Sequence, residues 1–119
     1  MFVTAAGSPR FRLLRAIDRG NLELVRLAAV ECERIELEDA LRILLLIRDQ
    51  DPDRYERAAV RWSGRLLATR PAIGFGRAAE VLSNAEGLAA PDGAVAAARL
   101  ALVMRTCGEP RLAEVLERS

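Results

Sequence analysis

The sequence contains no lysine and no histidine, so all 18 of its basic residues are arginine. Without lysine the chain has no side-chain amine for Schiff-base chemistry, and without histidine it lacks the usual general base near neutral pH. Its two cysteines, Cys32 and Cys107, belong to no CxxC pair, so neither a zinc site nor a thioredoxin-like motif is supported. Because no catalytic constellation is recognisable, we expect a protein that is not an enzyme and that carries no metal or cofactor.

Long apolar runs are also missing. The longest one in the middle of the chain spans Ile43 to Ile47, whereas a membrane-spanning helix needs about 20 apolar residues. A signal peptide is not apparent, because the first residues, MFVTAAGSPR, lack a basic segment followed by an apolar stretch. We therefore expect a cytoplasmic location, no contact with membranes and reduced thiols.

The remaining composition is that of a globular protein. Of the 119 residues, 51% are hydrophobic and 29% are charged, and the net charge is only +1. A chain of this length fits one domain with a sizeable core, so we predict a single helical domain over residues 1–119, with a flexible N-terminus at residues 1–7. The near-neutral balance means that any electrostatic function depends on local separation of charge.

Apolar residues recur at helical spacing between proline and glycine residues, and no segment shows the alternation of a β-strand. This pattern predicts an all-α fold of six or seven short helices, arranged as a compact bundle or as a short stack of helical hairpins. Short turns between helices favour antiparallel neighbours. The expected helices span residues 9–20, 21–34, 36–50, 51–69, 75–85, 91–107 and 111–118.

The helix at 36–50 is apolar on most sides, which predicts a central position with Leu41, Leu44 and Ile47 in the core. For the helix at 75–85 we expect the inward residues to be Phe75, Ala78, Ala79 and Leu82. The last helix of a stack has no next neighbour. We therefore expect partial exposure of Leu112, Val115 and Leu116, with a further apolar patch near residues 95–104.

The helix at 51–69 carries four arginines on one face. Their spacings are 3, 4 and 4, which places them in one stripe along the helix. Tyr55 and Trp62 lie on the adjacent face, at the same spacing as Ala59 and Leu66. The candidate binding residues are Arg54, Arg57, Arg61, Arg65, Tyr55 and Trp62. For the two aromatic residues we favour a second interpretation, in which they anchor the core with their polar tips near the surface.

The charges are separated along the chain. Residues 10–26 hold five arginines and two acidic residues, residues 31–39 hold five acidic residues and one arginine, and residues 54–77 hold six arginines and one glutamate. Two interpretations of the arginine stripe follow. Either the stripe is structural, with the acidic segment packed against a basic helix that it neutralises or with the arginines on an ordinary solvated surface, or the arginines are free to grip phosphates or carboxylates.

A weak internal repeat is present. Pro52-Asp53 and Ala58-Ala59 recur 39 residues later as Pro91-Asp92 and Ala97-Ala98, a period that suits helical hairpins of the HEAT or armadillo kind. In an alanine-rich chain two similar proline-capped helices would give the same match.

A resemblance to a protein group rests on residues 37–71. The residues that carry it are Asp51-Pro52, Arg57-Ala58-Ala59, Arg61-Trp62 and Arg65-Leu66. With these, the chain resembles short, uncharacterised all-helical proteins of high-GC actinobacteria. The resemblance implies a helical fold and a bacterial cytoplasmic setting, and it brings no activity or functional residue with it.

The sequence therefore favours a non-catalytic protein-binding or adaptor module that acts through a helix face. Its partner would be another protein or a second copy of the chain. The alternative is a small nucleic-acid-associated protein that uses the arginine-striped helix. A cationic stripe beside aromatic and aliphatic residues is suited to an acidic protein surface and to a nucleic acid alike. No known nucleic-acid-binding motif accompanies the stripe.

Overall fold

The computed structural model describes residues 7–119, in which seven α-helices and no β-strand are found. The predicted all-α fold is confirmed. The predicted flexible N-terminus at residues 1–7 lies outside the described residues, except for Gly7. The helices are α1 (Pro9–Asp18), α2 (Leu22–Val30), α3 (Leu37–Gln50), α4 (Tyr55–Thr69), α5 (Gly74–Gly87), α6 (Gly93–Thr106) and α7 (Pro110–Glu117), with short 3-10 turns η2 (Pro52–Arg54) and η3 (Pro71–Ile73) before α4 and α5.

The predicted punctuation sets the ends of the first two helices. Ser8 caps α1 by accepting a hydrogen bond from the backbone N–H of Phe11 (3.1 Å), and Pro9 occupies the first helical position. Gly20 follows the helix with a φ of 66°, in the left-handed region that glycine adopts without strain. Asn21 then caps α2 by accepting from the N–H of Leu24 (3.2 Å).

The second helix, α2, is shorter than predicted and ends at Val30 instead of near residue 34. The residues after it include Glu31 and Glu33, and negative charge is unfavourable next to the negative end of a helix dipole. The chain leaves the helix through two tight turns, in which the N–H groups of Glu31 and Cys32 donate to carbonyls three residues back.

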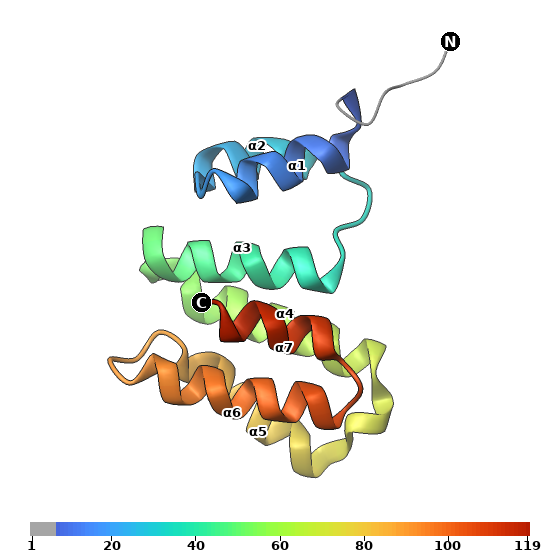
Figure 1. The fold of residues 1–119 in the computed structure, drawn as a ribbon, viewed down its shortest axis with the longest axis vertical. Helices are drawn as coiled ribbons and strands as arrows, with labels where there is room; N and C mark the ends of the chain where they lie inside the picture. Colours follow the sequence, from blue (N-terminus) through green and yellow to red (C-terminus); the bar gives the residue numbers. More distant parts are fainter. Residues whose placement is uncertain (1–6) are drawn as a thin grey trace.

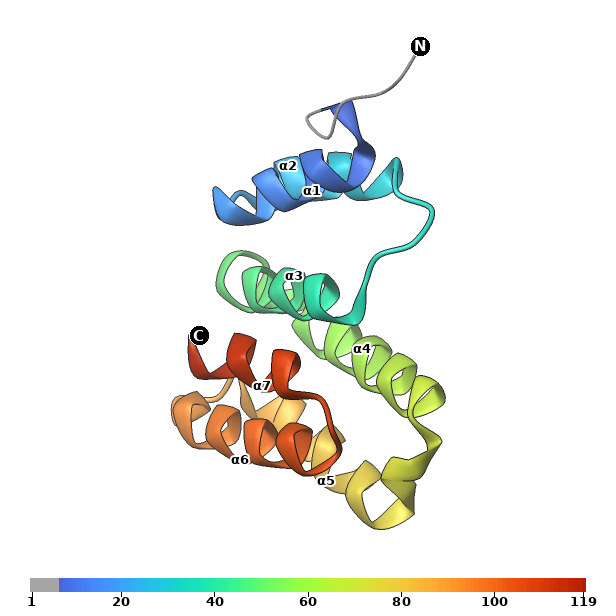
Figure 2. The same ribbon diagram turned by 45° about the vertical axis from the view of Figure 1, so that its right-hand side comes forward.

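The helices stack along the longest axis of a molecule that measures 50 × 30 × 22 Å. Figures 1 and 2 show the α1–α2 hairpin at one end, α3 beneath it, then α4 and α7, and the α5–α6 hairpin at the far end. The last helix does not extend the stack. It folds back, so that α7 packs against both α6 and α3.

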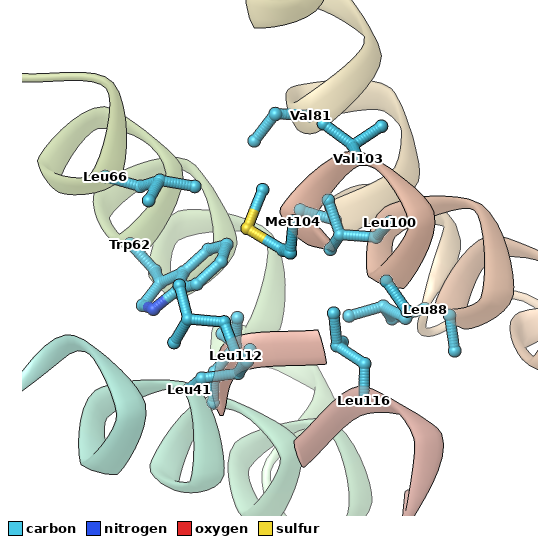
Figure 3. Packing of buried hydrophobic residues seen from close by; sticks show 14 of the residues in the cluster. Leu41, Trp62, Leu66, Val81, Leu88, Leu100, Val103, Met104, Leu112 and Leu116 are labelled. Carbon is cyan, nitrogen blue, oxygen red and sulfur yellow. The ribbon is translucent and has the colours of Figure 1, made fainter. Parts of the chain in front are cut away.

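Two hydrophobic clusters hold these layers together, and α3 contributes to both. The larger cluster lies among α3 to α7, with Met104 and Leu100 near its centre (Figure 3). The smaller cluster consists of Leu13, Ala16, Ile17, Leu22 and Val25, packed against partly buried residues of α3. Leu41 and Leu44 are buried and Ile47 packs against both clusters, so the predicted central position of α3 is confirmed.

The predicted inward face of α5 is wrong. The buried residues of α5 are Val81, Asn84 and Ala85, followed by Leu88. Of the residues predicted to face inward, Phe75 is 98% exposed, Ala79 and Leu82 are also exposed, and only Ala78 is half-buried. The helix packs against both α4 and α6, and all of its buried residues lie in its second half, while its first turn is exposed.

The C-terminal helix is also more buried than predicted. Leu112, Val115 and Leu116 are all buried, because α7 inserts between α3 and α6 instead of standing at an end of the stack. The alanine-rich helix α6 does expose apolar side chains, since Val95 and Leu102 lie on its outer face.

Candidate functional site

The arginine stripe lies on the surface and is divided between two elements, because Arg54 belongs to η2 and only the other three arginines belong to α4. Most of the stripe has no acidic partner among the described residues. Arg54 is the exception, because its Nε lies 3.6 Å from a carboxylate oxygen of Asp51. Arg57, Arg61 and Arg65 form no ion pair with any residue between 7 and 119. Three guanidinium groups on successive turns of one helix are therefore available to a ligand.

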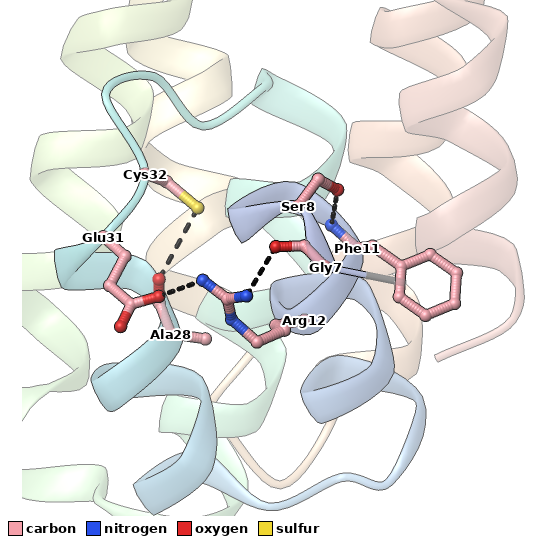
Figure 4. A network of polar contacts seen from close by, with 7 residues as sticks. All are labelled: Gly7, Ser8, Phe11, Arg12, Ala28, Glu31 and Cys32. Atoms are coloured by element: carbon pink, nitrogen blue, oxygen red, sulfur yellow. Dashed lines mark hydrogen bonds and ion pairs between the residues drawn. The ribbon is translucent and has the colours of Figure 1, made fainter. Parts of the chain in front are cut away.

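The acidic segment pairs with other arginines. Glu31 accepts from Arg12 of α1 at 2.5 Å, and Figure 4 shows the same guanidinium donating to the carbonyl of Gly7 (2.6 Å). Asp39 lies 3.5 Å from Arg10, again on α1. The interpretation that this segment neutralises a basic helix is therefore confirmed for α1, and it is wrong for the stripe of α4.

Tyr55 and Trp62 anchor the core, as the favoured interpretation predicts, but the expected position of the polar tips near the surface is wrong for Tyr55, whose hydroxyl is buried. Both are buried, and each uses its polar tip inside the fold: the Tyr55 hydroxyl donates to the carbonyl of Ala85 (2.6 Å) and the Trp62 indole N–H donates to the carbonyl of Leu37 (3.2 Å). Burial raises the pKa of Tyr55 to about 12, against a smaller opposite effect of Arg48. Neither ring offers a free face for stacking on a base.

An apolar groove runs along α3, between α2 and α4, with a volume of about 330 Å³. Its rim is formed by Arg61 and Arg65 of the stripe. Its apolar lining consists of Ala29, Ile35, Ala40, Ile43, Leu44, Ile47, Ala58 and Trp62. Although most of its ring is covered, Trp62 thus contributes one edge to the groove.

The sequence predicted the arginines at the rim of this groove, but it did not predict the groove itself. The spacing of the arginines is a property of one helix and can be read from the chain. The floor needs side chains from α2, from the segment before α3, and from α3 and α4 together. The only signal for it was the apolar excess of α3, whose Ile43 and Ile47 remain partly buried after both neighbouring layers have packed.

No protein-family model, curated protein or solved structure matches this chain. The resemblance to actinobacterial helical proteins therefore stays a prediction, and the geometry of the described residues is the basis for any functional argument. Within residues 7–119, no helix combines the length and the apolar character required to cross a bilayer.

Proposed function

We propose that this protein is a non-catalytic protein-binding module that holds an acidic amphipathic helix of its partner in the groove along α3. The observation that carries the proposal is the juxtaposition of an apolar groove with two rim arginines, Arg61 and Arg65, that have no acidic partner among residues 7–119. An apolar floor beside a cationic rim is complementary to a helix with one apolar and one acidic face.

The dimensions support this occupant. The groove lies at the lower end of the size range of ligand pockets, which suits two or three inserted side chains. Arg57 and Arg65 are eight residues apart, which is about 12 Å along the helix at 1.5 Å per residue. Carboxylates four residues apart on a partner helix would follow the same spacing. Exposed pairs each contribute only about 0–1 kcal/mol, so the inserted apolar groups supply most of the affinity and the arginines set the register.

The test uses two synthetic helical peptides of about 15 residues with leucines at helical spacing. One carries glutamates beside the leucine face and the other carries glutamines at those positions. We expect the glutamate peptide to bind with a change in the emission of Trp62, the only tryptophan of the chain, and the glutamine peptide to bind more weakly. Titration calorimetry gives the two dissociation constants.

Two variants separate the two halves of the site. Ala58→Leu narrows the groove and should block both peptides, whereas Arg61→Glu combined with Arg65→Glu should remove the preference for the acidic peptide. Arg99→Glu is the matched control, because Arg99 is exposed on α6 and lines no part of the groove. Unchanged binding in Ala58→Leu would contradict the proposal.

The alternative is nucleic-acid binding by the stripe, and the three unpaired arginines are the observation that favours it. Three neutralised phosphates would give a slope of log K against log salt of about −3. In that case Arg57→Glu with Arg61→Glu should abolish binding to a duplex or a single strand, and Ala58→Leu should leave it intact. Undetectable binding at low salt would end this alternative.

A further inference from the structure

A second cavity, polar and larger than the groove, lies at the edge of the stack where three helices begin. Its volume is about 720 Å³. The residues that line it come from the first turns of α1, α3 and α7, the segment before α3, and the end of α4. Figure 1 shows these ends together on the right-hand side of the view, although they are up to 100 residues apart in the sequence. The charged lining residues are Arg10, Arg34, Glu36, Glu38, Arg65, Arg70, Glu109 and Arg111.

The internal pairs leave this cavity with excess positive charge. Four of its eight charged residues are cancelled by ion pairs: Arg10 pairs with Asp39, Glu38 pairs with Arg42, and Arg70 pairs with Glu109, which also lines the cavity. The four that remain, which have no ion-pair partner in the described chain, are Arg34, Arg65, Arg111 and Glu36. Three arginines against one glutamate leave a net charge of +2.

The backbone offers unpaired N–H groups at two places, although Glu38 and Asp39 in the first turn of α3 offset the helix dipole there and Pro110 leaves α7 without an N–H at its first position. Helices α3 and α7 both begin at the cavity, and the residues that precede them, Glu36 and Glu109, make no side-chain capping hydrogen bond. The first N–H groups of a helix lack intrahelical acceptors and carry the positive end of the helix dipole. Uncapped helix starts next to free guanidinium groups are the two elements from which proteins build anion sites.

We propose that this cavity binds a small multivalent anion of the oligophosphate class, such as an inorganic oligophosphate or the phosphate chain of a nucleotide. Guanidinium groups that approach from three different elements can grip separate phosphates bidentately. The volume lies within the range for small-molecule ligands. Arg65 borders both the cavity and the groove, whereas Arg34 and Arg111 line only the cavity, so variants of these two residues test this proposal separately from the protein-binding function.

The test is titration calorimetry of the full chain with tripolyphosphate at about 150 mM salt. Sulfate and citrate are titrated in parallel to separate the oligophosphate from a single divalent anion and from a multivalent carboxylate. We expect saturable binding with one tripolyphosphate per chain and weaker binding of the other two anions. Arg34→Gln and Arg111→Gln should each weaken tripolyphosphate binding by about tenfold, since each removes one charge-assisted contact.

Arg61→Gln and Arg99→Gln are the matched controls, because both residues are exposed and neither lines the cavity. Their dissociation constants should stay within about twofold of the original. Absence of saturable binding would overturn the proposal, as would equal losses in the control variants or tighter binding of citrate. Arg34 and Arg111 are exposed, so circular dichroism should show unchanged helix content in their variants.

Discussion

The α1–α2 hairpin and the α3–α7 bundle are both helical, but different forces hold them in place. The bundle encloses a large apolar cluster, in which even the C-terminal helix is covered on its apolar face. The hairpin has a small cluster of its own and rests on one side of α3. The contrast indicates that the bundle determines the stability of the fold, and that the hairpin is an attached layer.

Polar contacts make up much of that attachment. The side-chain amide of Gln50, at the end of α3, donates to the carbonyl of Gly20 (2.5 Å) and accepts from the N–H of Leu22 (3.2 Å), so it bridges the turn of the hairpin. Beside it, Arg26 pairs with Asp51 at 2.5 Å. At the other end of the hairpin Arg10 pairs with Asp39. Since the groove and the oligophosphate cavity both include residues of this layer, its attachment governs both proposed sites.

The largest expected effect comes from a matched pair of core truncations. Leu44→Ala removes a buried side chain of the bundle and should lower the free energy of unfolding by about 2–5 kcal/mol. Leu13→Ala, at an equally buried position of the hairpin, should mainly speed hydrogen exchange in α1 and α2. Urea denaturation and hydrogen exchange measure the two effects.

Leu102→Ala serves as the control, because Leu102 is 67% exposed and its truncation should change stability by less than about 0.5 kcal/mol. A loss below about half a kcal/mol in Leu44→Ala would contradict the central position of α3. Equal effects of Leu13→Ala on exchange throughout the chain would show that hairpin and bundle unfold as one unit.

Much of the fold could be predicted from the sequence, because its boundaries are local chemistry. Ser8-Pro9, Asn21 and Gly20 act within one or two turns, and the structure places them where the pattern predicts. The return of α7 into the bundle could not be predicted in this way. It depends on which apolar faces meet in three dimensions, and no single helix carries that information. Phe75 shows the same limit, since its side chain is apolar and its helix turns it outward.

For the candidate site, too, the sequence predicted the local pattern and not the tertiary arrangement. The spacing of Arg57, Arg61 and Arg65 fixes their common face from the sequence alone. The sequence could not show that these arginines lack acidic partners, because several arginines were possible partners for Glu31 and Asp39. In the structure the two acidic residues pair with arginines of α1. The polar cavity needed the ends of four helices to converge, which only the tertiary fold provides.

An intermediate effect is expected at the polar bridge between the two regions. Gln50→Ala removes both hydrogen bonds to the hairpin turn and should cost about 1–2 kcal/mol. The loss should appear as faster hydrogen exchange in α1 and α2, with the slowest amides of the bundle unaffected. Gln50→Glu is the informative control, because its carboxylate can still accept from Leu22 and can no longer donate to Gly20. Unchanged exchange in both variants would show that apolar contacts alone hold the hairpin.

The smallest expected effect is a pH dependence that belongs to the same interface. Asp39 is buried, with 3% of its surface exposed, and this desolvation raises its pKa above the ordinary value of 3.8. Arg10 and Arg42 lower the pKa by a smaller amount, and the nearby Glu38 raises it further. A carboxyl whose pKa is higher in the folded state favours folding while it is protonated. Its contribution to stability is therefore full below about pH 3.8 and is lost as the pH rises through the folded pKa.

Comparison with Asp39→Asn isolates this contribution, because asparagine keeps the shape of the side chain and cannot ionise. The stability of the original protein relative to Asp39→Asn should fall as the pH increases from about 3.8 through the folded pKa of Asp39, and then stay constant. The surface pairs Arg12–Glu31 and Arg26–Asp51 are present in both proteins, so their own pH dependence cancels in the difference. A difference that increases with pH over this range would mean that the pairing with Arg10 outweighs burial. The Arg10–Asp39 contact would then add net stability to the attachment of the hairpin, beyond the position that it fixes between α1 and α3.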